Sequence, residues 1–167
     1  MIQKVVIFDR DNTLIKDKGY TYKTRDLKFL PQTIRAVKFL SKNNVKMFIV
    51  TNQSGIAKGF FSLKDLKKFH SYLNKKLSKH KVKINGFLFC PHHKNGVIKK
   101  FSFQCKCRKP ENLLIEKVKK KFKKKTNIVM FGDKNSDRKA AKKSKIKFFY
   151  RKKNFFDQIK SVYKNHL

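Results

Sequence analysis

Two aspartates separated by one residue, Asp9 and Asp11, directly follow a short and mostly apolar run at residues 4–8. The run contains Val, Ile and Phe without polar alternation, which predicts a strand buried on both faces of a parallel sheet. Ligands of such sheets bind beyond the carboxyl ends of the strands, where both carboxylates lie. Two adjacent carboxylates suit a hard divalent cation such as Mg²⁺, which also leaves room for a phosphate. By itself, the pattern is equally compatible with a surface turn.

A second group that could do chemistry lies between residues 90 and 107, which include all three cysteines of the chain and two adjacent histidines. An odd, clustered set of thiols favours a metal over a disulfide, and four thiolate and imidazole ligands suit tetrahedral Zn²⁺. The spacing C-x-H, twelve residues, C-x-C is less common in zinc sites than paired C-x-x-C. Thiols without a metal therefore remain the alternative.

Two later apolar runs also end at polar residues. The segment 51–55, Thr-Asn-Gln-Ser-Gly, follows one run, and its hydroxyl and amides could cradle a phosphate or form an ordinary turn. The segment 132–137 follows the other run and contains Asp133 and Asp137. Because the chain has only ten acidic residues, their recurrence at strand ends indicates that chemistry requires them there.

The elements that must position these groups can be predicted from apolar periodicity. Short apolar runs predict strands at residues 4–8, 45–50, 86–89, 128–131 and 147–150. Helical spacing predicts helices that begin near Pro31, Ser62 and Pro110, another at 138–144, and an amphipathic helix at the C-terminus. The alternation predicts an α/β fold, a doubly wound Rossmann-like parallel sheet, in a single domain over residues 1–167.

The chain is strongly basic, since 45 Lys and Arg residues against 10 Asp and Glu residues give a formal net charge of +35. Such a charge suggests a nucleic acid, an anionic membrane or a polyanionic substrate. The lysines are spread over nearly the whole chain, and no nucleic-acid recognition motif accompanies them. We therefore prefer compositional bias and do not expect nucleic acid as a partner. With no apolar stretch of membrane-spanning length and no signal-peptide layout, we expect a soluble cytoplasmic protein and a monomer.

The string Asp-x-Asp-x-Thr-Leu after an N-terminal apolar strand resembles the first motif of the haloacid dehalogenase superfamily. Its phosphatases use the first Asp as nucleophile and the second as general acid/base. The resemblance implies that Asp9 accepts the phosphoryl group and that Asp11 exchanges protons with the leaving oxygen and with water. The family usually has Gly where this chain has Asn12, and we expect Asn to be tolerated because it adopts a positive φ more readily than most residues.

The other superfamily motifs match three further positions. Thr51 matches the second motif and would hold the transferring phosphoryl group, and Lys109 matches the third, whose lysine bonds the nucleophile and the phosphate. Asp133 matches the fourth, and the resemblance implies Asp137 nearby as a residue that supports this metal carboxylate. The resemblance implies a catalytic Mg²⁺ on Asp9, the backbone carbonyl of Asp11 and Asp133. Core elements fill the stretches between the motifs, so we expect a capless member of the superfamily, without the inserted domain that many relatives carry.

Two longer strings, Thr-Asn-Gln-Ser-Gly-Ile-Ala and Cys-x-Cys-Arg-Lys-Pro, resemble one branch of the superfamily, the small phosphatases that act on heptose bisphosphate and on histidinol phosphate. Those enzymes carry a structural zinc loop of this form, which corresponds to residues 90–107. The matching Zn²⁺ ligands are Cys90, His92, Cys105 and Cys107, and His93 would then be a neighbour only.

Within this branch, the long arm at residues 94–104 is more like the enzymes that remove the 7-phosphate from D-glycero-D-manno-heptose 1,7-bisphosphate in the synthesis of lipopolysaccharide precursors. Lysines of the arm could hold the phosphate that is not cleaved. Histidinol phosphate is the alternative substrate. A nucleic-acid-binding protein, or a polynucleotide end phosphatase on the same core, is the alternative of another class. The expected contacts with a small phosphorylated sugar are Asp17, Gly19, Tyr20, Asn52, Gln53, Ser54, Arg108 and Lys134.

Overall fold

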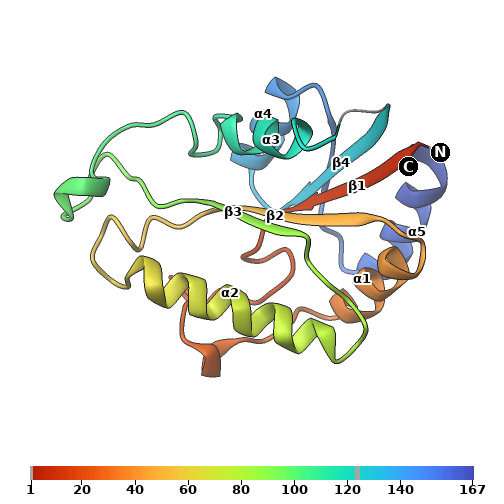
Figure 1. The fold of residues 1–167 in the computed structure, drawn as a ribbon, viewed down its shortest axis with the longest axis horizontal. Helices are drawn as coiled ribbons and strands as arrows, with labels where there is room; N and C mark the ends of the chain where they lie inside the picture. Colours follow the sequence, from red (N-terminus) through yellow and green to blue (C-terminus); the bar gives the residue numbers. More distant parts are fainter. Residues whose placement is uncertain (1, 123–124) are drawn as a thin grey trace.

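The computed structural model describes residues 2–122 and 125–167, and its centre is a five-stranded sheet in which neighbouring strands run parallel. The strand order is β3-β2-β1-β4-β5 (Figure 1). All five strands lie where the apolar runs predict them, which confirms the doubly wound α/β sheet. The strands span Gln3–Phe8 (β1), Lys46–Asn52 (β2), Gly86–Cys90 (β3), Thr126–Gly132 (β4) and Lys147–Tyr150 (β5).

Helices cover both faces of the sheet (Figure 1). Alternate residues of β1 pack on opposite faces of the sheet: Val6 and Phe8 lie on one face, and Val5 and Ile7 lie on the other. This burial on both sides explains the unbroken apolar run of the first strand. One face carries α1 (Thr33–Lys42), α2 (Leu63–Ser78) and α5 (Phe155–His166), and the other carries α3 (Leu113–Lys119) and α4 (Asn135–Lys143).

The central strand β1 lies where the order of strands reverses. The chain proceeds from β1 to β2 and β3 on one side and then returns to β4 and β5 on the other. Phe8, at the carboxyl end of β1, is level with Ile49 of β2 and Phe131 of β4. The segments that follow these three strands therefore leave the sheet side by side, at the switch point where ligands of this type of sheet bind.

The start of α2 agrees with its prediction, and two other starts differ. At α2 the Ser62 hydroxyl accepts the Asp65 backbone N–H at 3.1 Å, and the Asp65 carboxylate accepts the Ser62 backbone N–H at 2.9 Å. The helix expected near Pro110 begins at Leu113, after a turn. The helix expected at 138–144 begins three residues earlier, because a carboxylate of its first turn accepts the preceding backbone N–H groups.

The loops that surround the carboxyl ends of the strands include two short 3₁₀ helices, Thr24–Asp26 and Lys99–Phe101. Asn12 has a φ of 54°, so the positive φ expected for this substitution of the usual Gly is confirmed.

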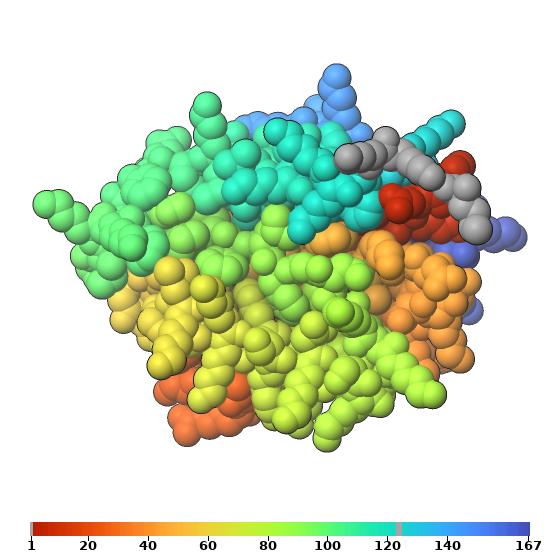
Figure 2. Space-filling model, in the orientation of Figure 1, coloured from red at the N-terminus to blue at the C-terminus, as the bar shows by residue number. Residues whose placement is uncertain are grey.

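The arm after β3 lies against the loop after β2, as Figure 2 shows at one end of the molecule, and the backbone N–H groups of Val97 and Ile98 donate to the Ala57 carbonyl. Among the described residues, no helix has the length and apolar character needed to cross a membrane.

Candidate active site

Asp9 is the first residue after β1, and its backbone N–H donates to the Phe131 carbonyl at 2.8 Å, which ties the end of β1 to β4. Its side chain is buried. The Lys109 ammonium donates to Asp9 Oδ1 at 2.6 Å and to the Val50 carbonyl at 2.8 Å. Two residues that lie 100 positions apart, and that the sequence assigns to the same reaction, are therefore in direct contact.

Lys109 lies between two carboxylates, because Asp137 Oδ1 is 2.7 Å from the same ammonium. The other oxygen of Asp137 accepts the backbone N–H groups of Asp133 at 3.2 Å and Lys134 at 3.0 Å. Gly132 allows this approach, since a Cβ at that position would lie 2.5 Å from Asp137 Oδ2. Asp137, which the fourth motif implies only as a support for Asp133, is thus a buried member of the site that contacts Lys109 directly.

The electrostatics of these groups favour a bound cation. Burial raises the pKa of Asp9 to about 7; the Lys109 ammonium opposes the shift, and the carboxylates of Asp137 and Asp11 add to it. Burial opposes the charge of Lys109, but Asp9 and Asp137 outweigh it and raise the pKa of the ammonium. Burial also raises the pKa of Asp133. The site contains more carboxylates than one lysine can neutralise, so Asp9 needs a further positive charge to be fully ionised near neutral pH.

Three carboxylates provide donors for such a cation. Oxygens of Asp9, Asp133 and Asp137 lie within 4.8 Å of one another. Asp133 Oδ1 is buried and has no hydrogen-bond partner among the described residues, which costs free energy unless a cation contacts it. Carboxylate oxygens are the ligands that Mg²⁺ prefers, so the residues present fit this ion.

Gln53 brings the two other predicted catalytic side chains together. Its side-chain amide donates to Asp11 Oδ2 and to Thr51 Oγ1, at 2.9 Å in both cases. Thr51 and Gln53 are buried at the end of β2, whereas the Asp11 side chain keeps 16% of its surface exposed. The nucleophile candidate, the proton-transfer candidate and the hydroxyl of Thr51 therefore meet at the ends of two neighbouring strands.

A cavity of about 420 Å³ lies over these groups, a size typical of small-molecule sites. Ser136 of α4 lines it, as does Lys134, the residue before the helix. Ser136 was not among the expected site residues. Within the described part of the chain, the lysines of the arm do not line this cavity. The lining includes Asp9, Asp11, Thr51 and Lys109 and all eight expected substrate contacts, which are Asp17, Gly19, Tyr20, Asn52, Gln53, Ser54, Arg108 and Lys134.

Asn52 makes contacts that hold another site residue in place. Its side-chain amide donates to the Lys109 carbonyl at 3.0 Å, and its Oδ1 accepts the Lys109 backbone N–H at 3.0 Å. This reciprocal pair fixes the backbone of Lys109 beside the end of β2. Asn52 therefore orients the ammonium of Lys109 in addition to lining the cavity.

The loop at residues 17–21 forms one wall of the cavity. Asp17 Oδ1 accepts the Gly19 backbone N–H at 3.1 Å and the Thr21 hydroxyl at 3.0 Å, which closes a turn. Gly19 has a φ of 80° and Tyr20 a φ of 57°. The Tyr20 hydroxyl accepts from the Lys58 ammonium at 2.7 Å. The loop is thereby joined to the segment after β2.

A second set of possible metal ligands lies where β3 ends. Cys105 Sγ is 3.4 Å from Cys90 Sγ and 3.1 Å from Cys107 Sγ, and His92 Nδ1 is 3.3 Å from Cys107 Sγ. The four donor atoms lie within 4.8 Å of one another. Three sulfurs and one imidazole nitrogen in this arrangement match the ligand types of a tetrahedral zinc site, so the residues present fit the group.

Burial shifts the pKa values of two of these candidate ligands. Burial raises the pKa of the Cys90 thiol and lowers the pKa of His92, so the imidazole is available as a neutral ligand. His93 lies outside the set, and its Nδ1 accepts the Asn95 backbone N–H at 3.2 Å. Arg108, which lines the cavity, donates to the His92 carbonyl at 3.3 Å and so joins the cysteine cluster to the candidate active site.

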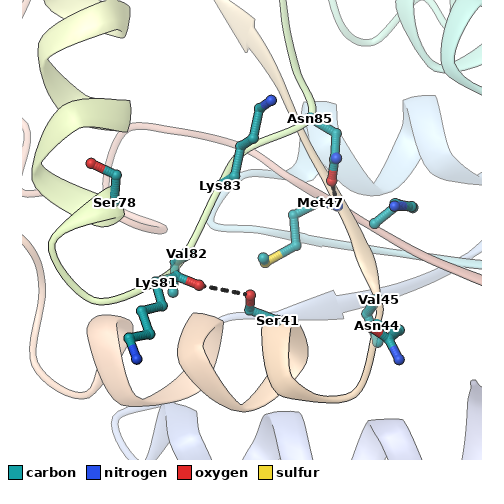
Figure 3. Close-up of a pocket in the computed structure, with 10 residues that line it drawn as sticks. Ser41, Asn44, Val45, Met47, Ser78, Lys81, Val82, Lys83 and Asn85 are labelled. Carbon is teal, nitrogen blue, oxygen red and sulfur yellow. Dashed lines mark hydrogen bonds between the residues drawn. The ribbon is translucent and has the colours of Figure 1, made fainter.

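A separate hollow of about 400 Å³ lies at the other end of the strands, near the start of β2 (Figure 3). The buried side chains of Val45, Met47 and Val82 line it, and Figure 3 shows Ser41 donating to the Lys81 carbonyl at its rim. Among the described residues that line it there is no Asp, Glu, His or Cys. The hollow therefore lacks the nucleophile and the metal donors that the cavity over Asp9 contains.

Arg10 is a site residue that sequence reasoning missed. Its side chain is completely buried and contacts Asp11, Gln53 and the carbonyl of Thr21. The available signal was its place between the two aspartates, because an arginine beside a carboxylate can pair with it through two nitrogens. Its other partners come from segments far away in the sequence and could not be inferred from it.

Comparisons with known proteins agree with this geometry. A family model described as Polynucleotide kinase 3 phosphatase matches residues 4–164. The D-glycero-beta-D-manno-heptose-1,7-bisphosphate 7-phosphatase of Haemophilus influenzae is 35% identical over 147 residues, which cover 87% of this chain and 79% of that protein. The D-glycero-alpha-D-manno-heptose-1,7-bisphosphate 7-phosphatase of Photorhabdus laumondii is 32% identical over 144 residues, which cover 86% of this chain and 79% of that protein.

Two solved structures share the fold. One is a D,D-heptose 1,7-bisphosphate phosphatase from B. bronchiseptica complexed with magnesium and phosphate, with a TM-score of 0.80 at 22% identity over 95% of this chain and 86% of that chain. The other is a had-like phosphatase from Mesorhizobium loti, with a TM-score of 0.80 at 24% identity over 87% of this chain and 70% of that chain. At these identities the two structures support the fold, and the relatives with higher identity indicate the class of reaction.

Proposed function

Because the chain belongs to the Polynucleotide kinase 3 phosphatase family of haloacid dehalogenase-like proteins, we propose that it is a Mg²⁺-dependent phosphatase that removes the 7-phosphate of D-glycero-D-manno-heptose 1,7-bisphosphate. The observation that carries the proposal is the direct contact of Lys109 with Asp9 under a cavity lined by Asp11 and Thr51. A buried carboxylate oriented by an ammonium is a nucleophile placed for attack on a phosphoryl group.

In the first half of the reaction, Asp9 attacks phosphorus and forms an aspartyl-phosphate, while Asp11 gives a proton to the leaving oxygen. Lys109 and the Thr51 hydroxyl hold the phosphoryl oxygens as charge develops on them. In the second half, Asp11 takes a proton from water, which attacks the aspartyl-phosphate and releases inorganic phosphate. Mg²⁺, held by Asp9, the Asp11 carbonyl and Asp133, would supply the positive charge that neutralises the phosphate and keeps Asp9 ionised.

The substrate proposal rests on the relatives and on the shape of the cavity. The wall formed by residues 17–21, the polar segment after β2 and Arg108 surround a space suited to a polar sugar, and Arg108 and Lys134 provide charge for the phosphate that stays bound. A phosphate bound away from the reacting centre supplies binding energy that can be used in catalysis. The relatives from Haemophilus influenzae and Photorhabdus laumondii are named for the beta and the alpha anomer respectively, so both anomers belong to the proposed substrate class.

The cysteine cluster is proposed to hold one structural Zn²⁺ that fastens the loop at 90–107 to the end of β3. Free thiols that act as metal ligands persist in a reducing compartment, which supports the cytoplasm as the place of action. We also propose that residues 1–167 act as one phosphatase domain and as a monomer, since a charge of +35 opposes association of identical chains.

The test is a comparison of kcat/KM for release of inorganic phosphate in the presence of Mg²⁺. Both anomers of the heptose bisphosphate are expected to exceed heptose 7-phosphate and histidinol phosphate by at least about tenfold, because the second phosphate adds binding energy. Asp9→Asn should lower turnover by more than about 1000-fold, as loss of a nucleophile does in other enzymes. Asp157→Asn, on the exposed surface of α5, is the matched control. Equal or better turnover of histidinol phosphate would overturn the substrate proposal.

Membership of the Polynucleotide kinase 3 phosphatase family favours a second candidate, a phosphatase acting on polynucleotide ends. A polyanionic substrate would suit the basic surface, and its binding would weaken steeply as salt rises. A 3′-phosphorylated oligonucleotide in the same assay discriminates between the candidates. Turnover of the oligonucleotide above that of every sugar phosphate, with a strong dependence on salt, would replace the first candidate by the second.

A further inference from the structure

Arg10 is the largest of the fully buried side chains. A buried guanidinium is costly unless its donors are paired. Here Nε donates to Asp11 Oδ1 and Nη2 donates to Asp11 Oδ2, both at 3.0 Å, so the guanidinium grips the carboxylate as a fork. Nη2 also donates to the Thr21 carbonyl at 2.8 Å and to Gln53 Oε1 at 3.2 Å. Arg10 therefore holds the proton-transfer candidate, the loop at 17–21 and the segment after β2 at one point.

The far side of the guanidinium is held by α2. Nη1 lies 3.3 Å from His70 Nε2, and the guanidinium carbon lies 4.9 Å from the centre of the Phe69 ring. Burial and the Arg10 charge lower the pKa of His70 to about 3. Because an arginine can only donate, Nε2 of the neutral His70 is the acceptor. Arg10 is thus held on one side by His70 and Phe69 of α2. On the other side it is held by the residues of the candidate active site.

These contacts make the two oxygens of Asp11 unequal. Oδ2 accepts from Arg10 and from Gln53 Nε2, which fills both of its lone pairs. Oδ1 is contacted by Arg10 alone among the described residues, with Nε at 3.0 Å and Nη2 at 2.9 Å. Because Asp11 lines the cavity, these contacts fix the orientation in which its carboxylate meets a substrate or a water molecule.

We propose that Arg10 is a positioning residue for proton transfer, which holds the carboxylate of Asp11 in the orientation from which it exchanges the proton. The proposal rests on the phosphatase function stated above. In the first half of the reaction, the bond from Asp9 to phosphorus forms, the bond from phosphorus to the leaving oxygen breaks, and the proton on the Asp11 carboxyl moves to that oxygen. In the second half, the Asp11 carboxylate takes a proton from water as the water oxygen bonds to phosphorus, which releases Asp9 and inorganic phosphate.

The leaving group distinguishes this role from a structural one. An alkoxide, such as a sugar oxygen, leaves poorly without a proton, whereas 2,4-dinitrophenolate leaves readily as an anion and does not need a general acid. A residue that positions the acid therefore affects alkyl phosphates far more than 2,4-dinitrophenyl phosphate. A residue that only supports the fold affects both substrates alike.

The experiment measures kcat and KM of the Mg²⁺-loaded protein with heptose bisphosphate and with 2,4-dinitrophenyl phosphate, for the wild type, Arg10→Met and Arg10→Lys. Loss of a positioned general acid is expected to lower kcat/KM, which reports only the steps up to the aspartyl-phosphate, by at least about 100-fold for the sugar phosphate and by less than about tenfold for the aryl phosphate. Arg10→Lys should behave similarly, because an ammonium cannot form the fork. It also provides the measurement if Arg10→Met fails to fold.

Arg151→Met is the matched control. Arg151 also donates to backbone carbonyls, those of Thr13 and Pro31, but it does not contact Asp11. The control is expected to leave the ratio of the two kcat/KM values unchanged. Equal losses of kcat/KM with both substrates in the Arg10 variants would overturn the positioning role while leaving the phosphatase function in place. If the wild type hydrolyses neither substrate, the proposed function itself fails, and the inference fails with it.

Discussion

Lys109 is held by two sets of contacts of different kinds. Its ammonium is fixed by the carboxylates of Asp9 and Asp137, and its backbone by the amide of Asn52. The first set keeps the lysine charged in a buried place, and the second sets the direction from which it reaches the nucleophile. A shortened or rotated side chain at any of these positions would therefore change where the phosphoryl group is held.

His70 makes a prediction about acid stability possible. Its pKa is 6.5 in the unfolded chain and is lowered to about 3 in the folded chain. Above pH 6.5 the residue is neutral in both states, so its full contribution is present there. As the pH falls, the unfolded chain gains a proton that the folded chain does not, and stability is lost until the pH reaches about 3. At about pH 5 this loss amounts to about 2 kcal/mol.

His70→Gln keeps an acceptor for Arg10 and removes the titration. Its free energy of unfolding is expected to rise relative to the wild type by about 2 kcal/mol between about pH 7 and about pH 5, measured by urea denaturation. His80→Gln, just beyond α2 and exposed, is the control and should show no such relative change. Parallel pH curves for His70→Gln and the wild type would show that His70 is not the residue responsible.

At the scale of elements, the carboxyl ends of β1, β2 and β4 determine which side chains can meet. The parallel register brings Phe8 level with Phe131, so the segments that begin at Asp9 and at Asp133 start side by side. β3 adds the cysteine cluster at the adjacent position of the same edge, and Arg108 follows that cluster directly in the chain. The loop at 90–107 therefore contributes to the active-site wall only if its own conformation is held.

Zinc is expected to hold that conformation. Protein purified without added metal should contain about one Zn²⁺ per chain by elemental analysis, and removal of the ion with a strong chelator should lower the Tm. His92→Ala should lose the ion, because it removes one of four ligands, whereas His93→Ala should retain it. Retention of zinc by both variants, or its absence from a wild type with three freely titratable thiols, would contradict the metal site.

The whole molecule carries its charge as a dispersed excess of lysine. Exposed pairs such as Lys18–Asp26 and Lys143–Glu111 involve few of these cations, and surface pairs of this kind contribute little to stability. Strand β1 and helix α5 lie close together, with the Lys4 ammonium donating to the Tyr163 hydroxyl at 3.0 Å (Figure 1).

Folding concentrates a charge of +35 in a small volume. Repulsion between these cations therefore opposes folding.

Salt should reduce this repulsion. Raising the ionic strength from about 0.01 M to about 1 M shortens the screening length from about 30 Å to about 3 Å, so the Tm is expected to rise. Replacing three exposed lysines of α2 and its end, Lys67, Lys75 and Lys79, by Glu should raise the Tm at low salt and leave it nearly unchanged at high salt. The corresponding Gln variants are the control for side-chain size and should give a smaller rise. A Tm that is independent of salt would contradict the argument.

The sequence by itself determined the elements and the chemistry-bearing positions. An unbroken apolar run is visible without a structure, because burial on both faces excludes polar residues along the whole strand. The carboxylates after β1 and β4 and the four candidate zinc ligands near β3 could be assigned from their resemblance to known motifs, because each motif is local, with its residues a fixed number of positions apart. The strand positions, the positive φ of Asn12 and the clustering of Cys90, His92, Cys105 and Cys107 in space are all confirmed.

The tertiary structure alone decided which side chains hold the site together. Arg10 meets His70 across 60 positions, Asn52 meets Lys109 across 57, and Asp137 shares the ammonium of Lys109 with Asp9. These partners have no periodic signature, because a hydrogen bond between distant segments depends on how the strands align and how α2 packs beneath them. Whether a charged residue is buried and paired or exposed to water is therefore a property of the packed chain, and its sequence neighbours do not reveal it.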